Sequence, residues 1–240
     1  CEDLWGGADV GQADRYAHFP AADLAQSCDL LVNLSASPYQ RGKPAQRLAQ
    51  ASSLARQAGC AVAVVNAVGG NDELIFDGHS FWTDGTQEFA LPGFEERVAR
   101  ATEAPVFDEP LAMDRKALVL GVRDYVRKSG GSRVVLGLSG GIDSALVCSL
   151  AVEALGPDHV VGVAMPSCFS STRSVADARE LARRLGCVLH EVSIEAWRVH
   201  TGLPAYGCIV QGEPRPRVPV RKLTAAATRV LPWVSRDDRV

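Results

Sequence analysis

The chain has 240 residues, 47% of them hydrophobic and 22% charged, so it is long enough for one large or two modest globular domains and is not expected to be disordered. Its formal net charge of −3 provides no overall basic field, which gives no support to a nucleic-acid or anionic-membrane partner. We therefore expect a small-molecule substrate.

The first hundred residues predict short buried strands separated by a helix. Residues 30–34 and 61–65 form apolar runs of strand length. Between them, Pro44 stands where a helix would begin, apolar residues recur at helical spacing up to Ala58, and Gly59 follows as a stop. This alternation is typical of a layered α/β domain.

Residues 74–91 change to alternating, aromatic-containing segments, which predict a β-meander with turns at Asp77-Gly78 and Asp84-Gly85. Residues 102–110 then contain two prolines and three carboxylates, a composition typical of a linker. We therefore predict a first domain over residues 1–108 and a second over residues 109–197.

The second predicted domain begins with a helix over about residues 111–128. It continues as strand 133–138, helix 142–155, strand 160–165, helix 175–185 and strand 188–192. Ser174 and Asp177 have the spacing of a capping box, which predicts Ser174 as the cap of the last helix. Strands that alternate with helices in this way predict a parallel, doubly wound sheet.

Beyond about Trp197 the periodic pattern stops. Residues 201–240 contain five prolines and six arginines with no sustained period of 2 or 3.6, so no core element is predicted there. We leave residues 198–240 unassigned, with the hypothesis that they are a non-native tail that replaces the end of the domain. Because the chain begins at Cys1 rather than at a methionine, we also expect it to be a segment of a longer chain.

Seven cysteines are scattered along the chain with no C-x-x-C pair and no His/Cys cluster at metal-ligand spacing. This pattern is typical of a reducing cytosol, so we expect a cytoplasmic protein. No apolar run approaches the roughly 18 residues of a membrane span, and no membrane partner is expected.

The segment Ser-Gly-Gly-Ile-Asp-Ser, residues 139–144, joins a predicted strand to a predicted helix. Its glycines leave backbone N–H groups at the helix N-terminus open to a polyphosphate. The hydroxyls of Ser139 and Ser144 can donate to phosphate oxygens, and Asp143 can hold the Mg²⁺ that accompanies ATP. The candidate ATP-binding residues are Gly137, Leu138, Ser139, Gly140, Gly141, Ile142, Asp143 and Ser144.

This segment resembles the S-G-G-x-D-S signature of the PP-loop ATP pyrophosphatases and lacks the lysine of a Walker A loop. The resemblance implies that ATP is cut to an adenylate and pyrophosphate. Met165-Pro166-Ser167, with the serines up to Ser174, further resembles the second-strand region of NAD synthetases, where the strand end lies near the adenine. A strand end followed by a helix cap explains most of these serines equally well.

The first half carries a second set of motifs in a specific order. Cys1-Glu2-Asp3-Leu4-Trp5 is followed by N-x-S-A-S-P-Y at residues 33–39, Gly42-Lys43, and V-N-x-V-G-G-x-D-E-L-x-F-D-G at residues 65–78. The set resembles the glutaminase half of the glutamine-dependent NAD synthetases. The resemblance implies the C-terminal part of a nitrilase-like α-β-β-α layered domain, followed by a Rossmann-like parallel-sheet PP-loop domain.

Carried over residue by residue, the resemblance makes Cys1 the nucleophile that attacks the glutamine amide and gives the backbone N–H of Glu2 to the oxyanion. Ser37 and Lys43 match positions that hold the glutamine α-amino and α-carboxyl groups. The alternative is that both residues are purely structural: Ser37 caps a turn, and Lys43 is a solvated residue before a helix.

The chain departs from the family pattern in two places. The glutamate base and the lysine of nitrilase chemistry lie upstream of the nucleophile in the family, and the later E-N-x-Q-A-R and G-N-K-S-E motifs have no counterpart after Trp197. We therefore expect that the chain cannot act as a glutaminase by itself unless those residues come from another chain or from missing sequence.

The family implies ATP- and Mg²⁺-dependent amidation of deamido-NAD to NAD, with glutamine or ammonia as nitrogen source and a homo-oligomeric full-length enzyme. Two rivals remain open. One is another PP-loop ligase, such as a tRNA-modifying enzyme, which would need an RNA-binding module that the first half does not resemble. The other is an inactive fragment that binds ATP or glutamine.

Overall fold

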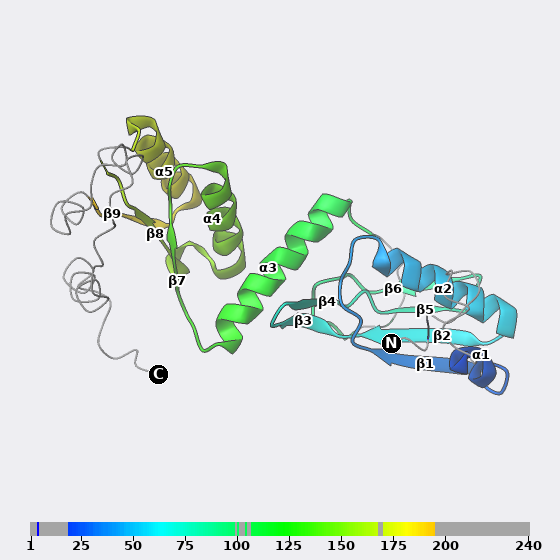
Figure 1. Cartoon of the computed structure of the whole chain (residues 1–240). Coiled ribbons are helices and arrows are strands. Elements are labelled where there is room, and N and C mark those ends of the chain that lie inside the picture. Colours follow the sequence, from blue (N-terminus) through cyan, green and yellow to red (C-terminus); the bar gives the residue numbers. More distant parts are fainter. Residues whose placement is uncertain are drawn as a thin grey trace, which may run out of the picture. The chain divides into compact units, whose positions relative to one another are not determined.

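The computed structural model describes Leu4, residues 19–98, Arg100, Ala104, and residues 107–167 and 170–194. The predicted tail at residues 198–240 lies outside this part of the chain, as does Cys1. Residue contacts divide the chain into two compact units at Ser132, except that Glu153–Leu155 group with the first. Figure 1 shows the elements of both units. No helix among the described residues is long and apolar enough to span a membrane.

The first unit contains two sheets and three helices among its described residues. Their order is α1 (Pro20–Ala25), β1 (Leu30–Ser35), α2 (Lys43–Ala58), β2 (Ala61–Asn66), β3 (Val68–Asn71), β4 (Leu74–Asp77), β5 (Phe81–Thr83), β6 (Glu88–Ala90) and α3 (Pro110–Lys128). The larger sheet has the strand order β1-β2-β5-β6, in which β1 and β2 are parallel and the other pairs antiparallel. The predicted strands at 30–34 and 61–65 and the helix between them are confirmed. The predicted burial of the first strand is wrong, because Leu30, Val32 and Leu34 of β1 are exposed.

Helix α2 covers one face of this sheet because its apolar residues fall on one side. Leu48, Ala51, Leu54 and Ala55 pack with Val62, Val64 and Phe81 of the sheet in one buried cluster. The helix ends where predicted, since Gly59 adopts a φ of 67° and donates its N–H to the carbonyl of Ala55. Alternation along β2 places the cluster on the covered face of the sheet.

The predicted β-meander is wrong at its first turn. β4 pairs with β3, whereas β5 pairs with β2, so Asp77-Gly78 leads from one sheet into another instead of closing a hairpin. The physical reason is long-range: Asp77 is fully buried by contacts with α2, and the Gly78 N–H donates to the carbonyl of Ala67 at 2.9 Å. The second turn is confirmed, since β5 and β6 pair across Asp84-Gly85.

Helix α3 packs on the β3–β4 hairpin. The Asp124 carboxylate accepts the Gly70 N–H at 2.8 Å, and the Lys128 ammonium donates to the Gly70 carbonyl at 2.5 Å. A side chain on Gly70 would lie 3.3 Å from the Gly121 Cα, so the two backbones approach closely. By contacts α3 thus belongs to the first unit, while the domain boundary between residues 108 and 109 stays a prediction.

The second unit is a parallel α/β layer. Its described elements are β7 (Val134–Gly137), α4 (Ile142–Leu155), a short 3₁₀ turn (Pro157–His159), β8 (Val160–Ala164), α5 (Thr172–Leu185) and β9 (Val188–Glu191). All strand pairs are parallel and follow the order β7-β8-β9, which confirms the predicted parallel sheet. The described strands do not include the reversal of order that defines a doubly wound sheet.

The predicted cap of the last helix is wrong by three residues. Ser171 has extended backbone angles and its hydroxyl accepts the Ser174 N–H at 3.0 Å, so α5 begins at Thr172. Ser174 is already helical, and Asp177 pairs instead with Arg173 at 3.7 Å. The predicted capping box is not formed because the helix has already begun when the chain reaches Ser174.

Ser171→Ala is expected to lower the free energy of unfolding by about 1 kcal/mol, because an N–H of the first turn loses its acceptor. Ser174→Ala is the matched control and should cost less than half as much. Urea unfolding followed by circular dichroism measures both. A larger loss for Ser174→Ala would contradict the cap that we assign.

Candidate functional site

The candidate ATP-binding loop begins where β7 ends. Leu138 extends the pairing by donating its N–H to the Val163 carbonyl at 2.9 Å, and its side chain is buried. It packs so closely on Gly162 that a Cβ there would lie 2.7 Å from a Leu138 methyl group. The Leu138 side chain therefore anchors the loop in the core and is not open to a ligand.

Residues 139–144 form a compact hydrogen-bonded loop. The Ser144 hydroxyl accepts the Ser139 N–H at 3.3 Å and donates to the Gly141 carbonyl at 3.0 Å. The two serine hydroxyls lie 3.1 Å apart, and the Ser139 hydroxyl also accepts the Gly141 N–H at 3.3 Å. The serines predicted to bind phosphate thus hold the loop in shape by their own hydrogen bonds.

Gly140 brings this loop against the first turn of α5. Its φ is +79°, and a Cβ built on it would lie 2.1 Å from the Ser174 carbonyl oxygen. No other residue fits there, because both the backbone angle and the space require glycine. The loop after β7 and the start of α5 after β8 are therefore in contact at one edge of the sheet.

Helix α4 starts in this loop without a side-chain cap. Gly141 is its N-cap residue, and Asp143 lies in the first turn. The first N–H groups of a helix have no partner within the helix, and together with the helix dipole they favour an anion. The Asp143 side chain is exposed, and no hydrogen bond or ion pair joins it to another described residue.

In the first unit, Ser37 and Lys43 lie on the connection from β1 to α2. Ser37 is buried, and the side chain of Asn66 bonds it twice: the Ser37 N–H donates to Asn66 Oδ1 at 2.8 Å, and its carbonyl accepts Asn66 Nδ2 at 3.3 Å. Lys43 is the first residue of α2. Ser37 and Lys43 thus lie six positions apart, one held by Asn66 and the other at the start of α2, while Cys1 lies outside the described residues.

The pKa of Lys43 is lowered by burial and by the nearby Arg47 guanidinium, with Asp77 acting in the opposite direction. Arg47 lies one helical turn further along α2, on the buried side. Its guanidinium holds Asp77 through both carboxylate oxygens and also donates to the Gly78 carbonyl at 3.2 Å. Lys43 and Arg47 thus place two positive charges near the start of α2, and the Asp77 carboxylate of β4 pairs with that of Arg47.

The same carboxylate is bonded by His79 Nδ1 at 2.8 Å. Arg47, Asp77 and His79 are at most 5% exposed, and Arg47 Nε has no partner among the described residues. Burial raises the pKa of Asp77, but hydrogen bonds from His79 and Arg47 outweigh it and lower the pKa overall. The carboxylate therefore stays ionised inside the unit.

Sequence reasoning missed Asn66, Arg47 and Asp77 as residues that shape this region. The sequence did indicate a buried role for Arg47, because a lone arginine on the apolar side of a predicted helix needs a buried anion. The indication for Asn66 was weaker, as a polar residue directly after a buried strand. The partners of both are about 30 residues away, which no local pattern identifies.

Comparisons with known proteins agree on one family. Residues 115–202 match the family model described as NAD synthase. The glutamine-dependent NAD(+) synthetase of Synechocystis is 42% identical over 201 residues, covering 78% of this chain and 36% of the relative. That of Rhodobacter capsulatus is 41% identical over 213 residues, covering 82% and 37%. The chain thus spans little more than a third of the length of these relatives.

Solved structures give the same result. The glutamine-dependent NAD+ synthetase from Acinetobacter baumannii, in complex with ADP, aligns with a TM-score of 0.75 and 32% identity over 96% of this chain and 46% of its own. The enzyme of the same name from Cytophaga hutchinsonii aligns with a TM-score of 0.62 at 20% identity, over 84% of this chain and 41% of its own, and supports the fold alone.

Proposed function

We propose, on the premise that residues 115–202 of this chain belong to the NAD synthase family, that its second unit binds ATP for the adenylation of deamido-NAD. A nicotinate carboxylate oxygen attacks the α-phosphorus of ATP, the α–β phosphoanhydride bond breaks, and pyrophosphate leaves. Ammonia then attacks the activated carbonyl, and AMP leaves. The relatives share a name that describes a ligase, which supports this assignment.

The observation that carries the proposal is the geometry of residues 139–144. The loop presents the start of α4, which has no side-chain cap, and Gly140 itself adds no side chain to the loop. Fixed N–H donors of this kind stabilise the charge of a leaving pyrophosphate without reorganising during the reaction. The Acinetobacter baumannii relative was solved in complex with ADP, which supports adenine-nucleotide binding by this chain.

Asp143 suits Mg²⁺ as a single carboxylate ligand. Its exposed side chain has no cationic partner among the described residues, and Mg²⁺ commonly binds one or two carboxylates together with substrate phosphates. The described residues contain no cluster of three or more His, Cys, Asp or Glu side chains that would form a site without the nucleotide. When bound, the ion would neutralise phosphate charge.

Asp143→Asn is expected to weaken ATP binding in the presence of Mg²⁺ about tenfold and to leave binding in EDTA nearly unchanged, because only the metal loses a ligand. Isothermal titration calorimetry with and without Mg²⁺ measures this. Asp158→Asn, an exposed carboxylate beyond the other end of α4, is the control. An equal loss with and without Mg²⁺ would remove Asp143 from the metal site.

For the first unit, the proposal is a nitrilase-like glutaminase over residues 1–108, with residues 109–197 as the synthetase domain. Cys1 attacks the glutamine amide carbon, ammonia leaves, and a thioester forms. Ser37 and Lys43 hold the α-amino and α-carboxyl groups of glutamine. The ammonium group of Lys43, at the first position of α2, supports a carboxylate at that position, whereas the charge of the buried Arg47 is already paired with Asp77.

NAD formation from deamido-NAD, ATP and Mg²⁺ tests the whole assignment, with ammonia and glutamine supplied separately. Turnover with ammonia supports the proposed synthetase, and turnover with glutamine also requires the glutaminase. ATP binding without turnover from either source would favour the binding-only alternative for this chain. No ATP binding at all would refute the proposal for the second unit.

A further inference from the structure

The connection from β1 to α2, residues 36–42, rests on β4 along one side. The Tyr39 N–H donates to the Ile75 carbonyl at 2.7 Å, and Pro38 forms a single antiparallel bridge with Phe76. Together with the two bonds from Asn66 to Ser37, these contacts hold the first half of the connection by its backbone. We refer to residues 36–42 as the β1–α2 loop.

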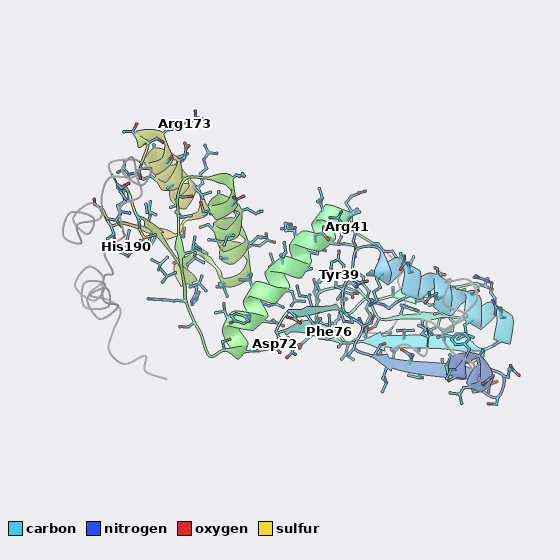
Figure 2. All side chains as sticks on the ribbon, viewed as in Figure 1. Tyr39, Arg41, Asp72, Phe76, Arg173 and His190 are labelled. Carbon is cyan, nitrogen blue, oxygen red and sulfur yellow. The ribbon has the colours of Figure 1, made fainter. Side chains whose placement is uncertain are left out.

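Side-chain contacts hold the middle of the loop from a second side. The Tyr39 hydroxyl donates to Asp114 Oδ1 at 2.9 Å, and the Arg41 guanidinium pairs with Asp114 Oδ2. Asp114 lies in the second turn of α3, more than 70 residues away in sequence. Figure 2 shows Tyr39 and Arg41 beside this helix. One carboxylate therefore uses both oxygens to bind two residues of the loop.

These contacts lie between the two residues proposed to hold glutamine. Ser37 lies two residues before Tyr39, and Lys43 two residues after Arg41. Gly42, at a φ of +81°, turns the chain between Arg41 and the start of α2. The Tyr39 ring also packs edge-on against Phe94, with ring centroids 5.4 Å apart. Because Asn66 holds Ser37 in place, a shift of Tyr39 and Arg41 changes the path of the loop between Ser37 and Lys43.

We propose that Asp114 is a positioning residue for glutamine, which fixes the distance between Ser37 and Lys43 by holding Tyr39 and Arg41. The inference rests on the function proposed for Ser37 and Lys43. Helix α3 is also the last helix before β7 in the sequence, so Asp114 ties the glutamine-binding loop to the segment that leads into the ATP-binding unit.

The protonation states of Asp114 and Tyr39 favour the hydrogen bond between them at neutral pH. Hydrogen bonds from Arg41 and Tyr39 lower the pKa of Asp114, so it remains a carboxylate. Burial, followed by the hydrogen bond to Asp114 and the charge of that residue, raises the pKa of Tyr39 to about 12, so the phenol remains a donor. Both partners thus keep the protonation state that the hydrogen bond needs.

Asp114→Ala tests the proposal, with Asp124→Ala as the matched control on the same helix. Asp124 also joins α3 to the rest of the first unit, but through the Gly70 N–H on β3 and not through the β1–α2 loop. The first readout is tryptic cleavage after Arg41, since the Lys43-Pro44 bond resists trypsin. Cleavage after Arg41 should be about fivefold faster in Asp114→Ala, because the loop opens more often, and unchanged in Asp124→Ala.

A second readout is independent of cleavage and of ligand. In ultraviolet titration, Asp114→Ala should move one tyrosine from a pKa of about 12 toward the ordinary range, and Tyr39→Phe should remove that transition altogether. Asp124→Ala should leave it in place. If neither cleavage nor titration changes in Asp114→Ala, the contact does not hold the loop, and the proposal is overturned whatever the glutamine result.

The third readout is L-glutamine affinity, measured by calorimetry on the whole chain. Asp114→Ala should raise the dissociation constant for glutamine about tenfold, because the two binding residues lose their spacing. Asp124→Ala should leave glutamine affinity unchanged, and ATP affinity should be unchanged in both variants. A freed loop with unchanged glutamine affinity would overturn the positioning role. Absence of glutamine binding in the unsubstituted chain would overturn the glutamine assignment and this role together, even where the cleavage result shows that Asp114 holds the loop.

Discussion

Gly140→Ala is expected to weaken ATP binding by at least about a hundredfold, which corresponds to about 2.7 kcal/mol. The residue adopts a φ of +79°, where an L side chain is strained by roughly 1–2 kcal/mol. The new Cβ would also lie 2.1 Å from the Ser174 carbonyl oxygen. Either the loop or the first turn of α5 must move, and the N–H groups at the start of α4 lose their arrangement.

Gly186→Ala is the control for backbone strain alone. Gly186 has a similar φ of +73°, ends α5, and would place its Cβ 3.7 Å from Pro157, which is ordinary contact. It should lower the free energy of unfolding by about 1 kcal/mol without changing ATP affinity. Calorimetry with ATP and urea unfolding on both variants separate the two effects. Equal ATP affinity in the two variants would show that the Gly140 contact does not shape the nucleotide site.

Asp77→Asn is expected to cost about 3–5 kcal/mol of unfolding free energy, because it leaves the Arg47 guanidinium buried without a counter-charge. Asp77 and Arg47 are 0% and 1% exposed, so water cannot replace the lost partner. Urea unfolding measures the loss. Glu180→Gln is the control, since Glu180 pairs with Arg183 and Arg184 on the surface and its loss should be too small to detect.

The Asp77 carboxylate also makes the free energy of unfolding depend on pH. The folded-state pKa of Asp77 lies below the ordinary value of 3.8, so its contribution is fully present above that pH and is lost as the pH falls through the folded pKa. The difference in unfolding free energy between the unsubstituted chain and Asp77→Asn should therefore shrink below pH 3.8. A difference that stays constant down to pH 2 would contradict an ionised Asp77.

Local patterns in the sequence were sufficient for helices α2 to α5 and for most strands, whereas the short helix α1 (Pro20–Ala25) was not predicted. Helical spacing of apolar residues placed α2, and its glycine stop is where predicted, because one residue at a positive φ ends a helix by itself. The Ser-Gly-Gly-Ile-Asp-Ser segment likewise predicted the strand, loop and helix of the candidate ATP site. In each case the signal and the structure lie within the same few residues.

Contacts between distant residues decided the rest. β4 pairs with β3 instead of β5 where the buried Asp77 meets Arg47, 30 residues earlier. Asp114 binds the β1–α2 loop across more than 70 residues. The spacing of apolar residues predicts which side of a helix or strand is apolar. A buried charge or a helix-capping side chain, however, needs a specific partner. Which partner reaches it depends on how the elements pack, and only the tertiary structure contains that information.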